Sequence, residues 1–142
     1  MGVKVNQSKG LKPVQVVAAV IYNQDNQILI AKRKDGQQNW EFPGGKIELE
    51  ENHQQALMRE LKEELGIEII EINRLLDTYT YTYPNKSVQL FFYQCYLNSP
   101  YALQKNVHAE LKWISMNDIK TFNFLSGNKR LVTGLCVEPQ KS

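Results

Sequence analysis

The chain of 142 residues lacks the features that mark several special classes of protein. Only two cysteines are present, Cys95 and Cys136, and they do not form a pair with the spacing of a metal or redox motif. Cys95 lies in an apolar aromatic run and Cys136 near the C-terminus, so we expect two buried free thiols, with their meeting in a disulfide left open. A reducing cytoplasm is the expected setting.

Long apolar runs and strong charge are also missing. No run approaches membrane-spanning length, and the first 13 residues contain no apolar segment of the secretory type. The net charge is only +2, which does not favour a nucleic-acid-binding face driven by bulk charge. Repeats, low-complexity tracts and linkers are absent too. We expect one soluble domain over 1–142 with an ordered core at about 14–137, loose ends at 1–12 and 138–142, and neither a membrane nor a nucleic-acid polymer as partner.

Hydrophobic patterning predicts a mixed β-sheet sandwiched between α-helices, a fold of the α/β (α+β) class. Polar residues 23–26 separate the first two strands and predict a hairpin turn. Ser115 or Asn117 caps a short helix, and a final helix carries Leu131, Val132 and Leu135. Strand-like runs lie at 14–22, 27–33, 74–83, 87–97 and 111–114.

The run TYTYTY alternates tyrosine with threonine, so one face of its strand is rich in tyrosine. Packing in the core is the first explanation for Tyr79, Tyr81 and Tyr83, and stacking on a base is the second.

A helix is expected at 53–65 from signals at both of its ends. Asn52 is placed as an N-cap with Gln55 three residues later, which is an amide variant of the capping box. Gly66 is placed to end the helix in a left-handed conformation. The apolar stripe that would enter the core consists of Leu57, Leu61 and Leu65.

Three glutamates, Glu60, Glu63 and Glu64, occupy an arc about 100° wide beside that stripe. Like charges three and four residues apart destabilise a helix, so a cation is expected to compensate. Carboxylate oxygens suit hard divalent ions such as Mg²⁺ or Mn²⁺, which keep waters and bridge to substrate phosphates. The alternative, a solvated charge-rich helix, does not explain why glycine, glutamate and arginine recur at fixed spacing from 45 to 67.

The segment 45–67 resembles the signature of the Nudix hydrolases: glycine, five residues, glutamate, seven residues, then Arg-Glu-apolar-x-Glu-Glu-x-Gly-apolar. Every specified position is filled. The preceding loop at 40–46, WEFPGGK, looks like the entry loop of the MutT-type nucleoside triphosphate pyrophosphohydrolases. The resemblance implies the Nudix fold and the metal-dependent cleavage of a nucleoside diphosphate linked to another group.

The same resemblance implies roles for individual residues. By this resemblance Glu51 helps to hold the loop and Glu110 is a candidate general base, with a solvated loop residue as the alternative. Arg59 lies four residues before Glu63 on the helix and can also reach back to the Glu51 loop, so we expect it to orient the carboxylates. His108 is expected to be exposed and His53 to be an ordinary helix residue. The implied metal ligands are Glu60, Glu63 and Glu64, with the carbonyl of Gly44 or Gly45.

Substrate contacts are implied for Arg33, Phe42, Lys46, Lys86 and Asn128. Asn128 matches an asparagine that reads the guanine edge in MutT-type enzymes, and a helix N-cap is the alternative. The family's two prolines before that asparagine are replaced here by Leu125 and Ser126. Phe42 resembles the aromatic that packs against the base, with a core side chain as the alternative, and Trp40 has the same two interpretations.

The resemblance, with these residues, implies a Mg²⁺-dependent hydrolase that releases nucleoside monophosphate and pyrophosphate, with Mn²⁺ as a substitute. The expected substrate is an oxidised purine nucleotide such as 8-oxo-dGTP. A pyrimidine triphosphate, a nucleotide sugar or ADP-ribose stays open as the substrate, and so does a non-catalytic nucleotide-sensing module. The oligomeric state is left open, with a monomer favoured.

Overall fold

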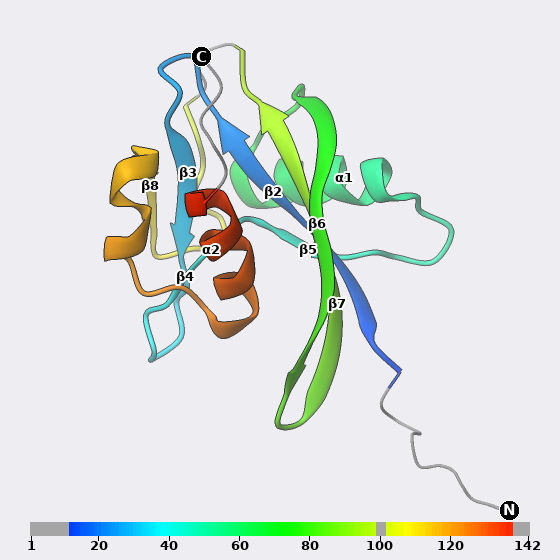
Figure 1. Ribbon diagram of the computed structural model, residues 1–142. Coiled ribbons are helices and arrows are strands. Elements are labelled where there is room, and N and C mark those ends of the chain that lie inside the picture. The colour runs from blue at the N-terminus through cyan, green and yellow to red at the C-terminus, as the bar shows by residue number, and fades with distance from the viewer. Residues whose placement is uncertain (1–11, 99–101, 138–142) are drawn as a thin grey trace, which may run out of the picture.

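The computed structural model describes residues 12–98 and 102–137, and its centre is a mixed seven-stranded sheet (Figure 1). The strands are β2 (Val14–Tyr22), β3 (Ile28–Lys32), β4 (Trp40–Glu41), β5 (Gly44–Lys46), β6 (Glu71–Tyr83), β7 (Lys86–Tyr96) and β8 (Glu110–Ile114). The main path runs β4-β3-β2-β7-β6, while β5 pairs with β2 and β8 pairs with β3. The helices are α1 (His53–Leu65), the 3₁₀ turns η1 (Met116–Thr121) and η2 (Ser126–Asn128), and α2 (Lys129–Val137).

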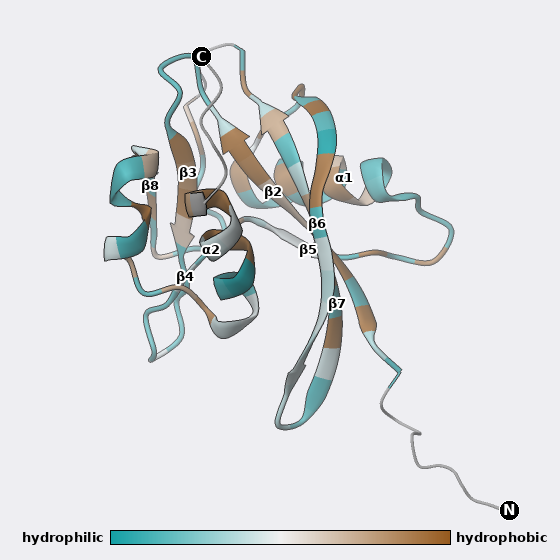
Figure 2. Cartoon of the chain, viewed as in Figure 1, coloured by the Kyte–Doolittle hydropathy of each residue, from teal (hydrophilic) through white to brown (hydrophobic). Residues whose placement is uncertain are grey.

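Strand β2 lies between two half-cores. It pairs in parallel with β7 and antiparallel with β3 and β5. Its apolar run, which Figure 2 shows, is nearly continuous because both of its faces are covered. Val17 and Ile21 pack with α1, while Ala18 and Val20 point to the opposite face with α2. In Figure 1 these helices cover opposite faces of the sheet.

Helix α1 begins and ends as its sequence predicts. Asn52 accepts from the backbone N–H of Gln55, and the Gln55 side chain accepts in return from the backbone N–H of Asn52. Gly66 adopts the left-handed conformation at φ 74° and donates to the carbonyls of the last turn. Leu57, Leu61 and Leu65 are fully buried, and burial of each contributes about 1.5–3 kcal/mol.

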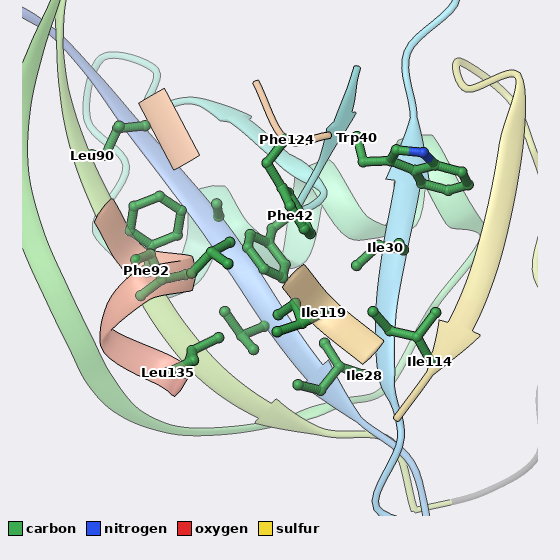
Figure 3. Packing of buried hydrophobic residues seen from close by; sticks show 14 of the residues in the cluster. Ile28, Ile30, Trp40, Phe42, Leu90, Phe92, Ile114, Ile119, Phe124 and Leu135 are labelled. Atoms are coloured by element: carbon green, nitrogen blue, oxygen red, sulfur yellow. The ribbon is translucent and has the colours of Figure 1, made fainter. Parts of the chain in front are cut away.

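The half-core on the other side of the sheet is aromatic (Figure 3). Phe42 stacks on Phe124 with ring centroids 5.3 Å apart and meets Phe92 edge-on at 6.2 Å. Trp40 contacts the ring of Phe122 edge-on at 5.4 Å. The core reading of Phe42 and Trp40 is therefore confirmed, and Phe42 lies at the wall of a cavity as well.

Most strands lie within three residues of their predicted bounds, and the hairpin at 23–26 and the Ser115 cap are confirmed. The segment 40–46 differs from prediction, because it contains the short strands β4 and β5 instead of only a loop. The tyrosines of β6 pack against the core, as predicted, and Cys95 is a buried free thiol; Cys136 is free but only partly buried. Of the predicted loose ends at 1–12 and 138–142, all but residue 12 lie outside the described residues. Within the described ranges, no helix has the length and apolar character needed to cross a membrane.

Candidate functional site

Two glycines of β5 bring the backbone close to the acidic face of α1. Gly44 has a φ of 158°, and a β-carbon there would overlap the carbonyl of Val17 on the neighbouring strand. A β-carbon on Gly45 would come within 2.6 Å of Glu60 Oε1. At position 44 only glycine clears the backbone of β2, whereas a larger residue at position 45 would displace the Glu60 carboxylate.

Glu60 and Glu64 form a close acidic pair at this place. Burial raises the pKa of Glu64, and a hydrogen bond to Glu60 and the charges of Glu60 and Glu41 raise it further. The backbone N–H of Gly44 donates to Glu64 and opposes this shift. Within residues 12–98 and 102–137, Glu64 Oε1 is one of two buried side-chain atoms that have no hydrogen-bond partner.

This arrangement fits a divalent cation. Two adjacent carboxylates, one with an unpartnered buried oxygen, lie beside the Gly44-Gly45 backbone, and hard cations prefer such oxygen donors. The described residues contain no group of three acidic, histidine or cysteine side chains that converge as a ready ligand set. Glu63 points outward with 59% of its side chain exposed. For such a cation, the side chains here would supply only part of a coordination shell, and waters would complete it.

Arg59 holds the loop between β5 and α1 against helix α1. Its Nε donates to Glu51 Oε2 at 2.6 Å and its Nη2 donates to Glu51 Oε1 at 3.0 Å, so the pair is bidentate. Nη2 also donates to the carbonyl of Lys46, and Nη1 reaches Glu60 at 3.0 Å and Glu63 at 3.4 Å. Glu51 in turn accepts from the N–H of Glu48. The predicted contact between Arg59 and the Glu51 loop is confirmed.

His108 is buried, so the prediction of an exposed loop histidine is wrong. Only 3% of it is exposed, and its Nε2 donates to Glu41 Oε2 at 2.9 Å. Arg33 Nη1 donates to the other oxygen of Glu41 at 2.9 Å, and Arg33 Nε pairs with Asp35. His108 Nδ1 is the second buried atom without a partner in the described chain. A cavity of about 310 Å³ has Arg33, Glu41, Glu64 and His108 in its wall.

Glu110 begins β8 and lies between two lysines, at 4.0 Å from Lys32 Nζ and 3.8 Å from Lys112 Nζ. It belongs to the walls of neither of the two cavities described here. His53 is the first residue of α1 and its Nδ1 is 2.7 Å from the hydroxyl of Tyr93.

A larger cavity of about 440 Å³ extends from the Gly44-Gly45 backbone to Asn128. Arg33, Phe42 and Lys86 line it, which brings together four of the five predicted substrate residues. Lys46 is exposed and outside this lining. Lys86 Nζ lies 5.9 Å from the ring centroid of Tyr83 at the turn between β6 and β7.

Asn128 is 6% exposed, and its Oδ1 accepts a hydrogen bond from the backbone N–H of Phe42 at 3.1 Å. A backbone N–H only donates, so this bond fixes which end of the amide faces Phe42. The Nδ2 group is the end left for the cavity. The Asn128 side chain therefore joins its own turn to the segment of Phe42, which is far away in sequence. A helix N-cap would instead bond to a backbone N–H within its own helix.

The residues that sequence reasoning missed are Glu41, as a partner of both Arg33 and His108, and the hydroxyls of Tyr79 and Tyr83, which contact Gly127. The alternation in TYTYTY placed the tyrosines on one face, but a local pattern carries no information about a partner more than 40 residues away.

Comparison with known proteins places these features in context. The NUDIX domain family matches residues 12–135. The chain is 33% identical to the 8-oxo-dGTP diphosphatase of Haemophilus influenzae over 132 residues, which cover 89% of this chain and 94% of that protein. It is 52% identical to the CTP pyrophosphohydrolase of Escherichia coli over 61 residues, 41% of this chain and 44% of that protein. The MutT protein from Methanosarcina mazei Go1 has the same fold, with a TM-score of 0.79 at 21% identity over 92% of this chain and 98% of that one.

Proposed function

The chain belongs to the NUDIX domain family, and on that premise we propose that it hydrolyses a nucleoside triphosphate to the monophosphate and pyrophosphate, with oxidised purine nucleotides such as 8-oxo-dGTP as its substrates. The observation that carries this proposal is one cavity that reaches from Gly44 and Gly45 of β5, beside Glu60, to Asn128. The phosphates would lie at the Gly44-Gly45 end of the cavity, and the base would lie at the end lined by Phe42 and Asn128.

Members of this family generally depend on a divalent metal, and Mg²⁺ is the ion that we propose here. Glu60 and Glu64 would hold it with a carbonyl of the Gly44-Gly45 segment, while Glu63 contributes from the exposed side through waters. Such an ion neutralises phosphate charge and lowers the pKa of a bound water. The chain's own part is to place the carboxylates: Arg59 and Glu51 fix the loop, and Gly45 leaves room for Glu60.

The chain also binds the charged and aromatic parts of the substrate. Arg33 and Lys86 lie in the cavity wall and offset part of the negative charge of a triphosphate. Arg33 is itself held by Glu41, which His108 holds from the other side. Phe42 presents an apolar wall in which the base is shielded from water.

Base recognition by Asn128 follows from the orientation of its amide. Because Oδ1 is engaged by Phe42, the cavity receives the donor group Nδ2. A donor suits a carbonyl oxygen on the base, such as the O6 of a guanine or an oxidised guanine, and it opposes the amino group of adenine or cytosine.

A second candidate substrate is a pyrimidine triphosphate, because the CTP pyrophosphohydrolase match reaches 52% identity over 61 residues. The donor that Asn128 offers would face the amino group of cytosine unfavourably, so we rank the purine carbonyl ahead of CTP.

The test is pyrophosphate release with Mg²⁺ across a panel of 8-oxo-dGTP, the ordinary nucleoside triphosphates, ADP-ribose and a nucleotide sugar. Glu64→Gln should abolish turnover, while Glu68→Gln, an exposed acid paired with Lys62, is the matched control. Preference for 8-oxo-dGTP supports the proposal. Preference for another nucleotide keeps the chemistry and replaces the substrate, and inactivity of the wild type across the panel overturns the assignment.

We further propose that the whole chain acts as one domain, because a single sheet contains the strands from β2 to β8, and that it acts as a monomer. A reducing cytoplasm is the proposed setting, which accords with the free thiols of Cys95 and Cys136.

A further inference from the structure

Two tyrosine hydroxyls of β6 form hydrogen bonds to the turn that carries Asn128. The Tyr79 hydroxyl donates to the carbonyl of Gly127 at 2.6 Å, and the Gly127 N–H donates to the Tyr83 hydroxyl at 2.9 Å. Both backbone groups of one residue are therefore engaged by side chains from a distant strand. The N–H of Leu131 donates to the Tyr79 hydroxyl at 3.3 Å, which extends the contact into α2.

The strand places these hydroxyls together because alternate residues share a face. Tyr79 and Tyr83 are both half-buried on the core side of β6. Burial raises the pKa of Tyr79 to about 12, so its hydroxyl keeps the proton that it donates. Arg130 covers the ring of Tyr79 at 4.7 Å and pairs with Asp77 at 3.5 Å, which leaves the tyrosine little freedom to turn away.

Glycine at position 127 can accept both of these contacts, whereas a residue with a β-carbon would clash. A β-carbon at position 127 would lie 2.6 Å from the Tyr83 hydroxyl and would push it away from the backbone N–H. The two residues before it, Leu125 and Ser126, do not restrict the backbone as proline does. The turn is therefore held by its local hydrogen bonds and by the two tyrosine hydroxyls, without a proline.

Asn128 follows Gly127 directly, so the hydrogen bonds to Gly127 place the backbone from which the Asn128 side chain reaches the Phe42 N–H. We propose that Tyr79 and Tyr83 are positioning residues for base recognition, which act by fixing the Gly127 peptide groups and through them the donor of Asn128. This inference rests on the role proposed above for Asn128. Tyr79 is the cleaner of the two cases, because Tyr83 lines the cavity and Tyr79 does not.

The test uses Tyr79→Phe and Tyr83→Phe, each of which removes a single oxygen and keeps the ring. Tyr81→Phe is the matched control, since Tyr81 lies on the same face, its ring is 4.7 Å from that of Tyr83, and no hydrogen bond to its hydroxyl is present in the described chain. Kinetics are measured with 8-oxo-dGTP and dATP, and amide hydrogen exchange is measured at Gly127.

Each Phe variant should raise KM for 8-oxo-dGTP about fivefold, the factor that corresponds to one ordinary hydrogen bond. The kcat should change little, because contacts to the base are the same in the ground state and the transition state. The ratio of kcat/KM for 8-oxo-dGTP over dATP should fall, and Gly127 should exchange faster in Tyr83→Phe. Tyr81→Phe should match the wild type in all four readouts.

Asn128→Ala, measured in parallel, separates the two proposals. If Asn128→Ala lowers the discrimination ratio and the Tyr79 and Tyr83 variants leave it at the wild-type value, the positioning role is overturned while base recognition stands. If Asn128→Ala leaves the ratio unchanged, base recognition fails and the positioning role fails with it. A loss of kcat at constant KM in Tyr79→Phe would indicate a purely structural role and would also overturn the inference.

Discussion

Gly45 faces the carboxylate of Glu60 so closely that a β-carbon on residue 45 would lie 2.6 Å from Glu60 Oε1. Replacing Gly45 with alanine should push that carboxylate out of place. Misplacement of a reacting or ligating group by about 1 Å costs on the order of 100-fold in rate, so kcat should fall by about that factor. Steady-state kinetics at saturating Mg²⁺ measure the loss.

Gly36→Ala is the matched control for that substitution, because nothing lies within 4 Å of a β-carbon at Gly36. Its activity should equal that of the wild type. Equal activity in both alanine variants would show that Glu60 tolerates displacement and would remove it from the set of metal ligands.

Arg59→Lys should lower activity far more than stability. Lysine keeps the charge but cannot make the bidentate contact to Glu51 while also holding the Lys46 carbonyl and Glu60. We expect kcat to fall at least tenfold, whereas the free energy of unfolding should change by only about 1 kcal/mol because these groups are partly exposed. Arg74→Lys on the exposed side of β6 is the control. Full activity of Arg59→Lys would contradict the orienting role.

The stability of the metal-free protein should fall as the pH rises. Burial and Glu60 raise the pKa of Glu64 in the folded state, whereas in the unfolded chain the carboxyl titrates near 4.5. Above pH 4.5 the folded protein holds more protons than the unfolded chain, so the free energy of unfolding decreases with pH until Glu64 has lost its proton in both states. The slope approaches about 1.4 kcal/mol per pH unit where the two states differ by one proton.

Denaturant titrations in a chelator at several pH values measure this slope. Glu64→Gln stays neutral and should flatten it, while Mg²⁺ should restore stability most strongly at high pH, where the carboxylates are free to bind. An unchanged slope in Glu64→Gln would assign the pH dependence to other groups.

Asn128→Asp should change the preferred base instead of abolishing binding. The carboxylate still accepts from the N–H of Phe42, but it presents an oxygen to the cavity where the wild type presents Nδ2. Relative kcat/KM should shift by about tenfold or more from carbonyl-bearing bases such as 8-oxoguanine toward amino-bearing adenine or cytosine. Competition assays with paired nucleotides measure the shift, and an unchanged order of preference would rule out reading of the base by this side chain.

Helix α1 could be predicted to the residue because its signals are local. The Asn52 cap, the leucine stripe and Gly66 all lie within the helix or next to it. The two caps act through hydrogen bonds of five residues or fewer, and the leucines repeat every four residues. The acidic face was predicted for the same reason. Its division into a buried Glu64, a partly buried Glu60 and an outward Glu63 was not, because that depends on where β5 lies.

The contacts that sequence reasoning missed join distant segments. His108 meets Glu41 across 67 positions, and Tyr79 meets Gly127 across 48. A histidine in a polar loop has no local sign of burial, and the Gly-Pro-rich stretch around β4 and β5 lacks the alternation by which strands are predicted. Such contacts become visible only when the sheet order is known.

The parallel pairing of β2 with β7 also decides when the site can form. Val14 of β2 lies opposite Val88 of β7, and Tyr22 lies opposite Tyr96. Strand β2 therefore cannot complete its pairing until β7 has been synthesised, which happens after α1 and β6. A nascent chain that ends before β7 carries every acid of the signature but leaves one edge of β2 unpaired. Assembly of the acidic pair in its final surroundings is therefore a late event in folding, and ribosome-bound chains should gain protease resistance in one step once β7 has emerged.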